Sequence, residues 1–230
     1  NRFRVEFGFR ATHSAAKLGE SLTTDPTRAS GEQVATMLKD CGVNLNFAPV
    51  VDLNLNPENP IIAKVERSFS DRVEKVVAHA RAWIEAHRKE GILTCLKHFP
   101  GHGSSTVDSH KGFTDISRSW TEKELEPFRN LIEEKKADAI MTAHVFNDRL
   151  DGQYPATLSK QVITGLLRET LGFDGVIVSD DMQMGAIRKH YPPETALRLV
   201  IEAGADIVCF GNNVAFEPGI VPKVKALILN

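Results

Sequence analysis

Short apolar runs recur along the chain and alternate with longer segments in which apolar residues lie three or four positions apart. The runs contain few polar interruptions, a pattern that favours strands buried on both faces over strands with one face in water. There are five such runs, at residues 43–51, 92–96, 139–143, 175–178 and 205–210. They are the predicted strands.

A segment with helical spacing precedes each predicted strand. These predicted helices cover residues 31–41, 73–90, 121–136, 160–171 and 193–203. Ser119, Thr121 and Ser159 are candidate N-caps. Glycine follows the predicted helices at positions 42, 91, 172 and 204, as is typical of helix C-termini. Helices that alternate with buried strands indicate an α/β protein with a parallel sheet.

Polar, reactive residues follow all five predicted strands. They are Asp52, Lys97 with His98, His144, Asp180 with Asp181, and Asn212. In a (β/α)8 TIM-type barrel, the carboxyl ends of the strands carry the active site. Five strands are too few to close such a barrel. We therefore expect one catalytic barrel domain over residues 1–230 that lacks about three N-terminal strands. A doubly wound sheet is the alternative, but it would gather ligand residues at one switch point.

Composition excludes some classes of function. The chain is 42% hydrophobic, carries a formal net charge of −2 and shows no basic stripe, so nothing indicates a nucleic-acid partner. No apolar run approaches the roughly 18 residues of a membrane span. Three widely separated cysteines, two of them inside apolar runs, form neither a disulfide framework nor a zinc motif. They favour a reducing compartment, and we expect a cytoplasmic protein, with secretion as the alternative.

The segment Ser179-Asp180-Asp181 places a carboxylate at the end of a buried strand. A carboxylate in that position is costly unless it is hydrogen-bonded or used in chemistry. Asp181 is suited to cap the helix expected next, which leaves Asp180 as the candidate catalytic group. The alternative interpretation makes Asp180 itself a helix cap.

A second candidate is the loop KHFPGHGSSTVDSHKGF, which holds three of the eight histidines. On an extended segment, Asp108 and His110 point to the same side. The carboxylate can then fix the tautomer of the imidazole and raise the basicity of its other nitrogen, which gives a general acid/base. A solvated loop with a chance pair is the alternative.

Other candidates are less specific. Lys97 at a strand end is suited, with His98, to donate to ligand hydroxyls, and Arg67 offers a planar donor or is a surface residue. His144 either contacts a ligand or is a capped core histidine. The loop histidines with Asp108 have no zinc-motif spacing, although a metal-dependent barrel hydrolase remains an alternative.

Several segments together resemble a known family. They are KHFPGHGSSTVDSH, VNLNFAPVVDLN, ERSFS, MTAHV with YPATLS, and GFDGVIVSDDMQMGAI. These resemble the catalytic barrel domain of family-3 glycoside hydrolases, in particular the bacterial β-N-acetylglucosaminidase branch. The resemblance covers essentially the whole chain.

The resemblance implies a retaining glycosidase that needs no cofactor or metal. Asp180 would be the nucleophile and His110, held by Asp108, the acid/base. Residues matching the sugar-binding positions are Arg67, Lys97, His98 and Arg2. The implied partner is a glycan with terminal β-linked N-acetylglucosamine, from peptidoglycan turnover or chitin, with water or phosphate as acceptor. A non-catalytic sugar-binding barrel is a further alternative.

Overall fold

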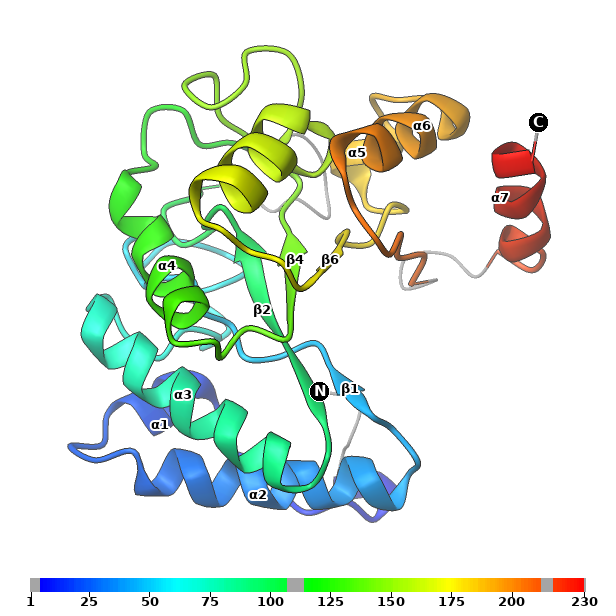
Figure 1. Cartoon of the computed structure of the whole chain (residues 1–230). Helices are drawn as coiled ribbons and strands as arrows, with labels where there is room; N and C mark the ends of the chain where they lie inside the picture. Colours follow the sequence, from blue (N-terminus) through cyan, green and yellow to red (C-terminus); the bar gives the residue numbers. More distant parts are fainter. Residues whose placement is uncertain (1–4, 107–113, 212–216, 230) are drawn as a thin grey trace.

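A parallel sheet forms the centre of the computed structural model, which describes residues 5–106, 114–211 and 217–229. Its strands, in spatial order, are β1 (Leu45–Asn46), β2 (Leu93–Phe99), β4 (Ala139–Thr142) and β6 (Val176–Val178) (Figure 1). A bridge from Val178 to Ile207 continues the order. The strands follow one another in chain order without a reversal, as in a barrel and unlike a doubly wound sheet.

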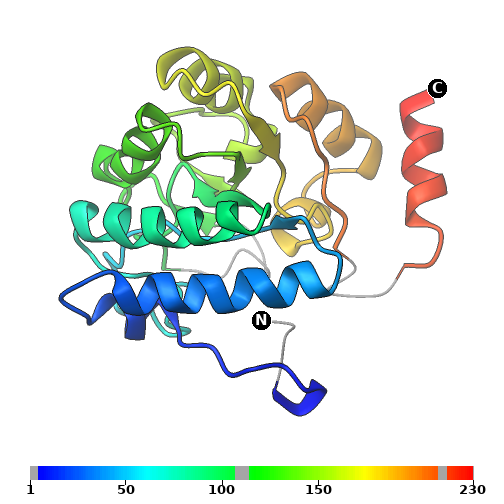
Figure 2. The same ribbon diagram turned by 60° about the horizontal axis from the view of Figure 1, so that its bottom comes forward.

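Helices and short strands connect these elements. They are η1 (Val5–Phe7), α1 (Ala15–Gly19), α2 (Asp25–Asp40), α3 (Val73–Lys89), β3 (Thr114–Asp115), η2 (Glu122–Leu125), α4 (Glu126–Glu133), β5 (Val145–Phe146), η3 (Ala156–Leu158), η4 (Gln161–Thr170), α5 (Gly185–Arg188), α6 (Pro193–Ala203) and α7 (Ile220–Leu229). The strands β3 and β5 pair with each other in a separate parallel sheet. Figure 2 shows α2 and α3 lying side by side beneath the sheet.

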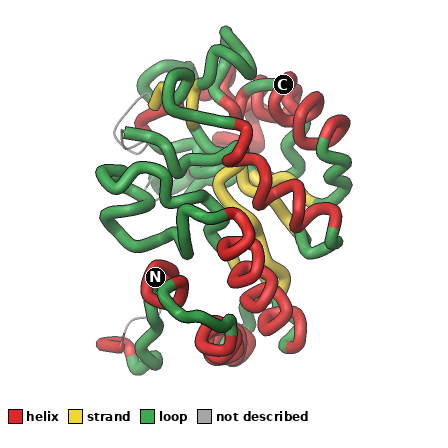
Figure 3. The backbone as a smooth tube through the Cα atoms, turned by 90° about the vertical axis from the view of Figure 1, so that its left-hand side faces the viewer, coloured by secondary structure: helices red, strands yellow, loops and turns green. Residues whose placement is uncertain are grey.

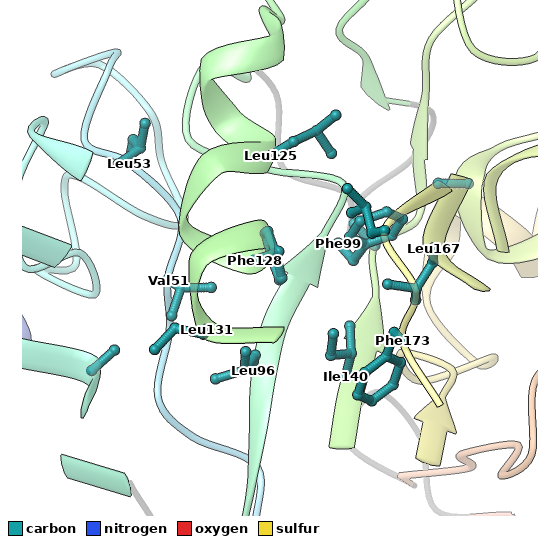
Figure 4. Packing of buried hydrophobic residues seen from close by; sticks show 14 of the residues in the cluster. Val51, Leu53, Leu96, Phe99, Leu125, Phe128, Leu131, Ile140, Leu167 and Phe173 are labelled. Carbon is teal, nitrogen blue, oxygen red and sulfur yellow. The ribbon is translucent and has the colours of Figure 1, made fainter. Parts of the chain in front are cut away.

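The core lies between the sheet and its covering helices. Leu96 and Ile140 point from neighbouring strands toward Phe128 and Leu131 of α4 (Figure 4). The opposite face of the same strands carries a second cluster, formed by Cys95, Ala139, Met141 and Val178 with Cys209 beside it. Burial on both faces explains why the strands appear in the sequence as unbroken apolar runs.

The predicted helix ends are largely confirmed. Gly42, Gly91, Gly172 and Gly204 follow helices with φ between 66° and 105°, in the left-handed region that glycine adopts without steric cost. The hydroxyl of Ser159 accepts the N–H of Val162, as expected of a helix cap. Thr121 stands at the start of η2, but its side chain makes no capping bond, and Ser119 is not a cap.

Two predicted boundaries are wrong for identifiable reasons. The helix α2 begins at Asp25 rather than at residue 31, because Pro26 initiates the helix and Gly31 lies within it. A Cβ on Gly31 would lie 2.9 Å from the Cβ of Ala86, so this glycine allows α2 to approach α3 closely. The expected helix at 121–136 divides into η2 and α4 where Pro127 starts the second helix.

The first and last predicted strands are shorter than expected. The strand predicted at 43–51 is reduced to β1 and a bridge from Val50 to Lys97, since Pro49 between them has no N–H to donate. The strand predicted at 205–210 is reduced to the bridge at Ile207. Within the described residues, no helix is both long and apolar enough to cross a membrane.

Candidate active site

The carboxyl ends of the parallel strands bring four predicted site residues to one edge of the sheet. Lys97 and His98 lie at the end of β2, His144 follows β4, and Asp180 follows β6. Figure 3 shows that most loops gather on one side of the molecule. The predictions for Arg2, Asp108 and His110 fall outside the described residues and stay predictions.

Asp180 is a half-buried carboxylate at the start of the loop after β6. Its Oδ1 accepts the N–H of Asp181 at 2.8 Å. Burial acts to raise the pKa of Asp180, but interactions with His144, with His98, with the Asp181 N–H and with Lys97 together hold it below its ordinary value. The group is therefore ionised at neutral pH, as a nucleophilic carboxylate must be.

Lys97 lies on the same face of β2 as Cys95, because the side chains of a strand alternate between its two faces. Its ammonium is close enough to Asp180 for their charges to interact. Burial lowers the pKa of Lys97, the charge of Arg67 lowers it further, and Asp180 opposes both. A half-buried ammonium beside a carboxylate is suited to hold a hydroxyl of a ligand between them.

A chain of three side chains fixes the position of Arg67. Asp52 Oδ2 lies 2.7 Å from Nδ1 of His98, and Nε2 of His98 lies 3.0 Å from Arg67 Nη2. Arg67 also donates from Nη1 to the carbonyl of Ile61 at 3.0 Å. The half-buried guanidinium is thus held from two sides and is not a free surface group.

Proton positions in this chain follow from the chemistry of the partners. A carboxylate accepts, so Nδ1 of His98 carries the proton, and Nε2 accepts from the guanidinium, which only donates. Burial lowers the pKa of His98, with Asp52 opposing. Burial acts to raise the pKa of Asp52, but the ring and backbone N–H of His98 hold it low. The result is an ionised Asp52 and a neutral ring that positions Arg67; contact of His98 with a ligand stays a prediction.

The first part of the loop after β2 is buried and braced. The amide of Asn59 donates to the carbonyls of His102 and Gly103 and to Ser105 Oγ. Trp120 Nε1 donates to the carbonyl of Pro100 at 3.0 Å. The loop segment before the predicted acid/base therefore has one defined conformation.

Glu124 is a second buried carboxyl that the sequence did not single out. Its Oε2 accepts the N–H groups of Gly103 at 2.9 Å and Ser104 at 3.2 Å, while Oε1 has no hydrogen-bond partner among the described residues. Burial raises the pKa of Glu124 to about 7. Its signal in the sequence is weak, because Glu124 lies among other acidic residues on what reads as an ordinary helix.

His144 is buried, as its alternative interpretation as a capped histidine requires. Its Nδ1 lies 2.9 Å from Thr157 Oγ1, and its Nε2 lies 3.0 Å from the carbonyl oxygen of Asp181. The ring therefore links η3 to the loop that carries Asp180. Thr157 was not among the residues indicated by the sequence.

The expected role of Asp181 is corrected by the structure. The next helix, α5, begins only at Gly185 with Met184 at its N-cap, so Asp181 does not cap it. Asp181 Oδ1 instead accepts the N–H groups of Gln183 and Gly211 at 3.0 Å each. The Asp181 carboxylate thus links the loop after β6 to the segment that follows the strand predicted at residues 205–210. Asp180 does not cap α5 either, since the N-cap of that helix is Met184.

The described residues contain no group of three or more His, Cys, Asp or Glu side chains arranged to hold a metal ion. His102, one of the loop histidines considered as a metal ligand, places Nδ1 2.7 Å from Ser105 Oγ. Burial, with a smaller contribution from the neighbouring ring of His98, lowers the pKa of His102 to about 4, so the ring is neutral.

Comparison with known proteins decides the family. Residues 8–230 match the glycosyl hydrolase family 3 N-terminal domain. The chain belongs to this family. The N-terminal domain of family 3 is a TIM-type (β/α)8 barrel, so the parallel sheet is part of such a barrel and the predicted fold class is confirmed.

Two curated relatives that the chain matches are named as beta-hexosaminidases. Beta-hexosaminidase A of Pseudoalteromonas piscicida is 37% identical over 205 residues, which are 83% of this chain and 33% of that protein. Beta-hexosaminidase of Tolumonas auensis is 37% identical over 229 residues, 97% of this chain and 66% of that protein. The chain thus spans between one third and two thirds of the length of these relatives.

Solved structures agree with the fold and the family. A family 3 β-N-acetylglucosaminidase from Paenibacillus sp. str. FPU-7 superposes with a TM-score of 0.83 at 36% identity, covering 88% of this chain and 39% of that one. The β-N-acetylhexosaminidase from Beutenbergia cavernae gives a TM-score of 0.88 at 30% identity, covering 96% and 66%.

Proposed function

We propose that the protein is a retaining, exo-acting glycosidase that releases terminal β-linked N-acetylglucosamine from peptidoglycan fragments or chitin oligomers. Family membership and the names of the relatives support the reaction class. One structural observation carries the proposal to this chain. Asp180 is kept ionised at the carboxyl end of the barrel strands, with Lys97 and the Asp52–His98–Arg67 chain beside it.

In the first step, a carboxylate oxygen of Asp180 attacks the anomeric carbon. The bond from that carbon to the leaving-group oxygen breaks, and His110, oriented by Asp108, gives its proton to that oxygen. The transition state has oxocarbenium character and ends in a covalent glycosyl–Asp180 ester.

In the second step, His110 removes a proton from water, which attacks the anomeric carbon and releases Asp180. Two displacements return the sugar with its original β configuration. Arg67, Lys97 and Arg2 hold hydroxyls of the terminal sugar, and His98 acts through Arg67. The carbohydrate is the only partner that this reaction requires, and no cofactor takes part.

The proposal is tested by hydrolysis of 4-nitrophenyl N-acetyl-β-glucosaminide by the full-length protein, with and without EDTA. We expect turnover that EDTA leaves unchanged. The Asp180→Ala variant should lose activity entirely. The His110→Ala variant should release one equivalent of nitrophenol and then stall, since this leaving group needs no acid but the ester still needs a base.

A matched control is Asp174→Ala. Asp174 is exposed at the opposite end of β6, and no activity should be lost. Absence of turnover in the parent protein would favour a non-catalytic sugar-binding barrel, and loss of turnover with EDTA would favour a metal-dependent hydrolase. Either result contradicts the proposal.

A further inference from the structure

His144 has a hydrogen-bonding environment that fixes its protonation state. The residue is 1% exposed, and oxygen atoms face both ring nitrogens. The partner of Nε2, at 3.0 Å, is the carbonyl oxygen of Asp181. A carbonyl oxygen only accepts, so Nε2 carries a proton.

The Thr157 hydroxyl determines the proton on the other nitrogen. Its oxygen lies 2.8 Å from the carbonyl oxygen of Ala143, to which it donates its one proton. The Thr142 hydroxyl at 2.8 Å and Nδ1 of His144 at 2.9 Å then supply protons to the two remaining lone pairs. Nδ1 is therefore also a donor.

The alternative arrangement is unfavourable. If Thr157 donated to Nδ1 instead, the lone pairs of its oxygen and of the Ala143 carbonyl would face each other at 2.8 Å. Both atoms belong to buried residues, where an uncompensated polar contact is expensive. An imidazole with protons on both nitrogens carries a full positive charge.

We propose that His144 is a protonated imidazolium up to at least pH 8 and is a positioning residue that supplies the fixed positive charge beside the Asp180 carboxylate. The proposal deepens the function proposed above, since it rests on Asp180 as the nucleophile. It also assigns a purpose to Thr157, which orients the ring and accepts one of its protons.

The surrounding charges are consistent with this assignment. A buried cation is stable only when it is paired and hydrogen-bonded. The loop after β6 presents the carboxylates of Asp180 and Asp181, and β2 presents the cation of Lys97 and the neutral ring of His98. Among these neighbours of Asp180, His144 is the charge that does most to keep the pKa of that carboxylate low.

The first experiment reads the protonation state directly. Nitrogen-15 NMR of histidine-labelled full-length protein at pH 8, about 1.5 units above the ordinary histidine value, reports both ring nitrogens. A His144→Gln spectrum assigns the signal by its absence. We expect both nitrogens of His144 to be protonated. One unprotonated nitrogen at that pH overturns the proposal, whether or not the protein hydrolyses a glycoside.

Two Thr157 variants distinguish the effect of the hydroxyl group on the protonation of His144 from the effect of side-chain packing. Thr157→Ser keeps the oxygen that accepts from Nδ1, whereas Thr157→Val removes it. We expect His144 to remain an imidazolium at pH 8 in the serine variant and to be neutral in the valine variant. An imidazolium that persists in the valine variant contradicts the proton assignment.

The second experiment tests the effect on Asp180. The acidic limb of kcat/KM reports the free nucleophile, which must be ionised to attack. Removing the charge of His144 raises the pKa of Asp180, so the acidic limb in His144→Gln should move to higher pH. The basic limb, set by the acid/base, should not move. An unchanged acidic limb overturns the charge role, and a parent protein without turnover counts against the proposed function instead.

Discussion

The carboxylate of Asp52 receives three N–H groups, two from His98 at the end of β2 and one from His102 in the loop that follows. Its Oδ2 lies 2.7 Å from Nδ1 of His98, the backbone N–H of His98 donates at 3.1 Å, and the N–H of His102 donates at 2.9 Å. Asp52 is 1% exposed. One buried charge therefore sets both the path of the backbone and the tautomer of the ring that positions Arg67.

Replacing Asp52 with Asn should weaken both the fold and substrate binding. The amide NH₂ of Asn would face N–H donors in place of an accepting oxygen, so we expect the free energy of unfolding to fall by about 2 kcal/mol. Urea denaturation measures this loss. Asp40→Asn, on the exposed end of α2, is the control and should leave the midpoint unchanged.

A double-mutant cycle tests whether Asp52 acts through Arg67. Asp52→Asn and Arg67→Ala should each lower kcat/KM for the aryl glycoside, mostly through a rise in KM of about tenfold, or about 1.4 kcal/mol. The double variant should lose no more than Arg67→Ala alone, because the first residue acts by placing the second. Additive losses would show that Asp52 has an independent role.

The parts of the fold that depend on local sequence were predictable. The glycines after four helices need only their own left-handed φ, and the buried strands need only an apolar run. The order of the parallel strands follows from their alternation with helices. The predicted start of α2 was wrong, because Gly31 lies inside this helix and not at its end. The glycine is needed there for the close approach of α3.

For the candidate site as well, the sequence predicted where some residues lie but not the contacts that others make. The placement of Lys97, His98, His144 and Asp180 at one edge of the sheet was predictable because the carboxyl ends of parallel strands converge. The roles of Asp52 and Glu124 depend on partners 46 and 21 residues away in the chain, and no spacing rule relates them. Asp52 did have a signal, since it follows a strand as the other site residues do.

The close approach of Gly103 to the backbone of Leu53 predicts a severe effect of a single methyl group. A Cβ on this residue would lie 1.7 Å from the carbonyl oxygen of Leu53, which is backbone and cannot rotate away. We expect Gly103→Ala to lower the free energy of unfolding by about 3 kcal/mol or to displace the loop.

The matched control is Gly152→Ala, since nothing lies within 4 Å of a Cβ built on Gly152. That variant should keep the parent stability in thermal or urea denaturation. Equal stability of Gly103→Ala and the parent, with unchanged kcat/KM, would mean that the loop accommodates the methyl group and that its path is not fixed as described.

The raised pKa of Glu124 predicts that the stability of the protein falls as pH rises toward about 7. Its folded pKa of about 7 lies above the unfolded value of about 4.5, so the native state binds a proton more tightly than the unfolded state does. Its stabilising contribution is complete below about pH 4.5 and is lost as pH rises to about 7. The loss is on the order of 3 kcal/mol.

Glutamine at position 124 removes this titration. Its amide oxygen can still accept the N–H groups of Gly103 and Ser104, so the loop contact is retained. The difference in unfolding free energy between parent and Glu124→Gln, measured in urea from pH 4.5 to 8, should therefore change in favour of the variant as pH rises. Glu122→Gln, exposed in the same turn, should track the parent at every pH. Parallel curves for the parent and Glu124→Gln would mean that Glu124 is already ionised in the folded protein at low pH, with the two N–H groups and not burial governing its charge.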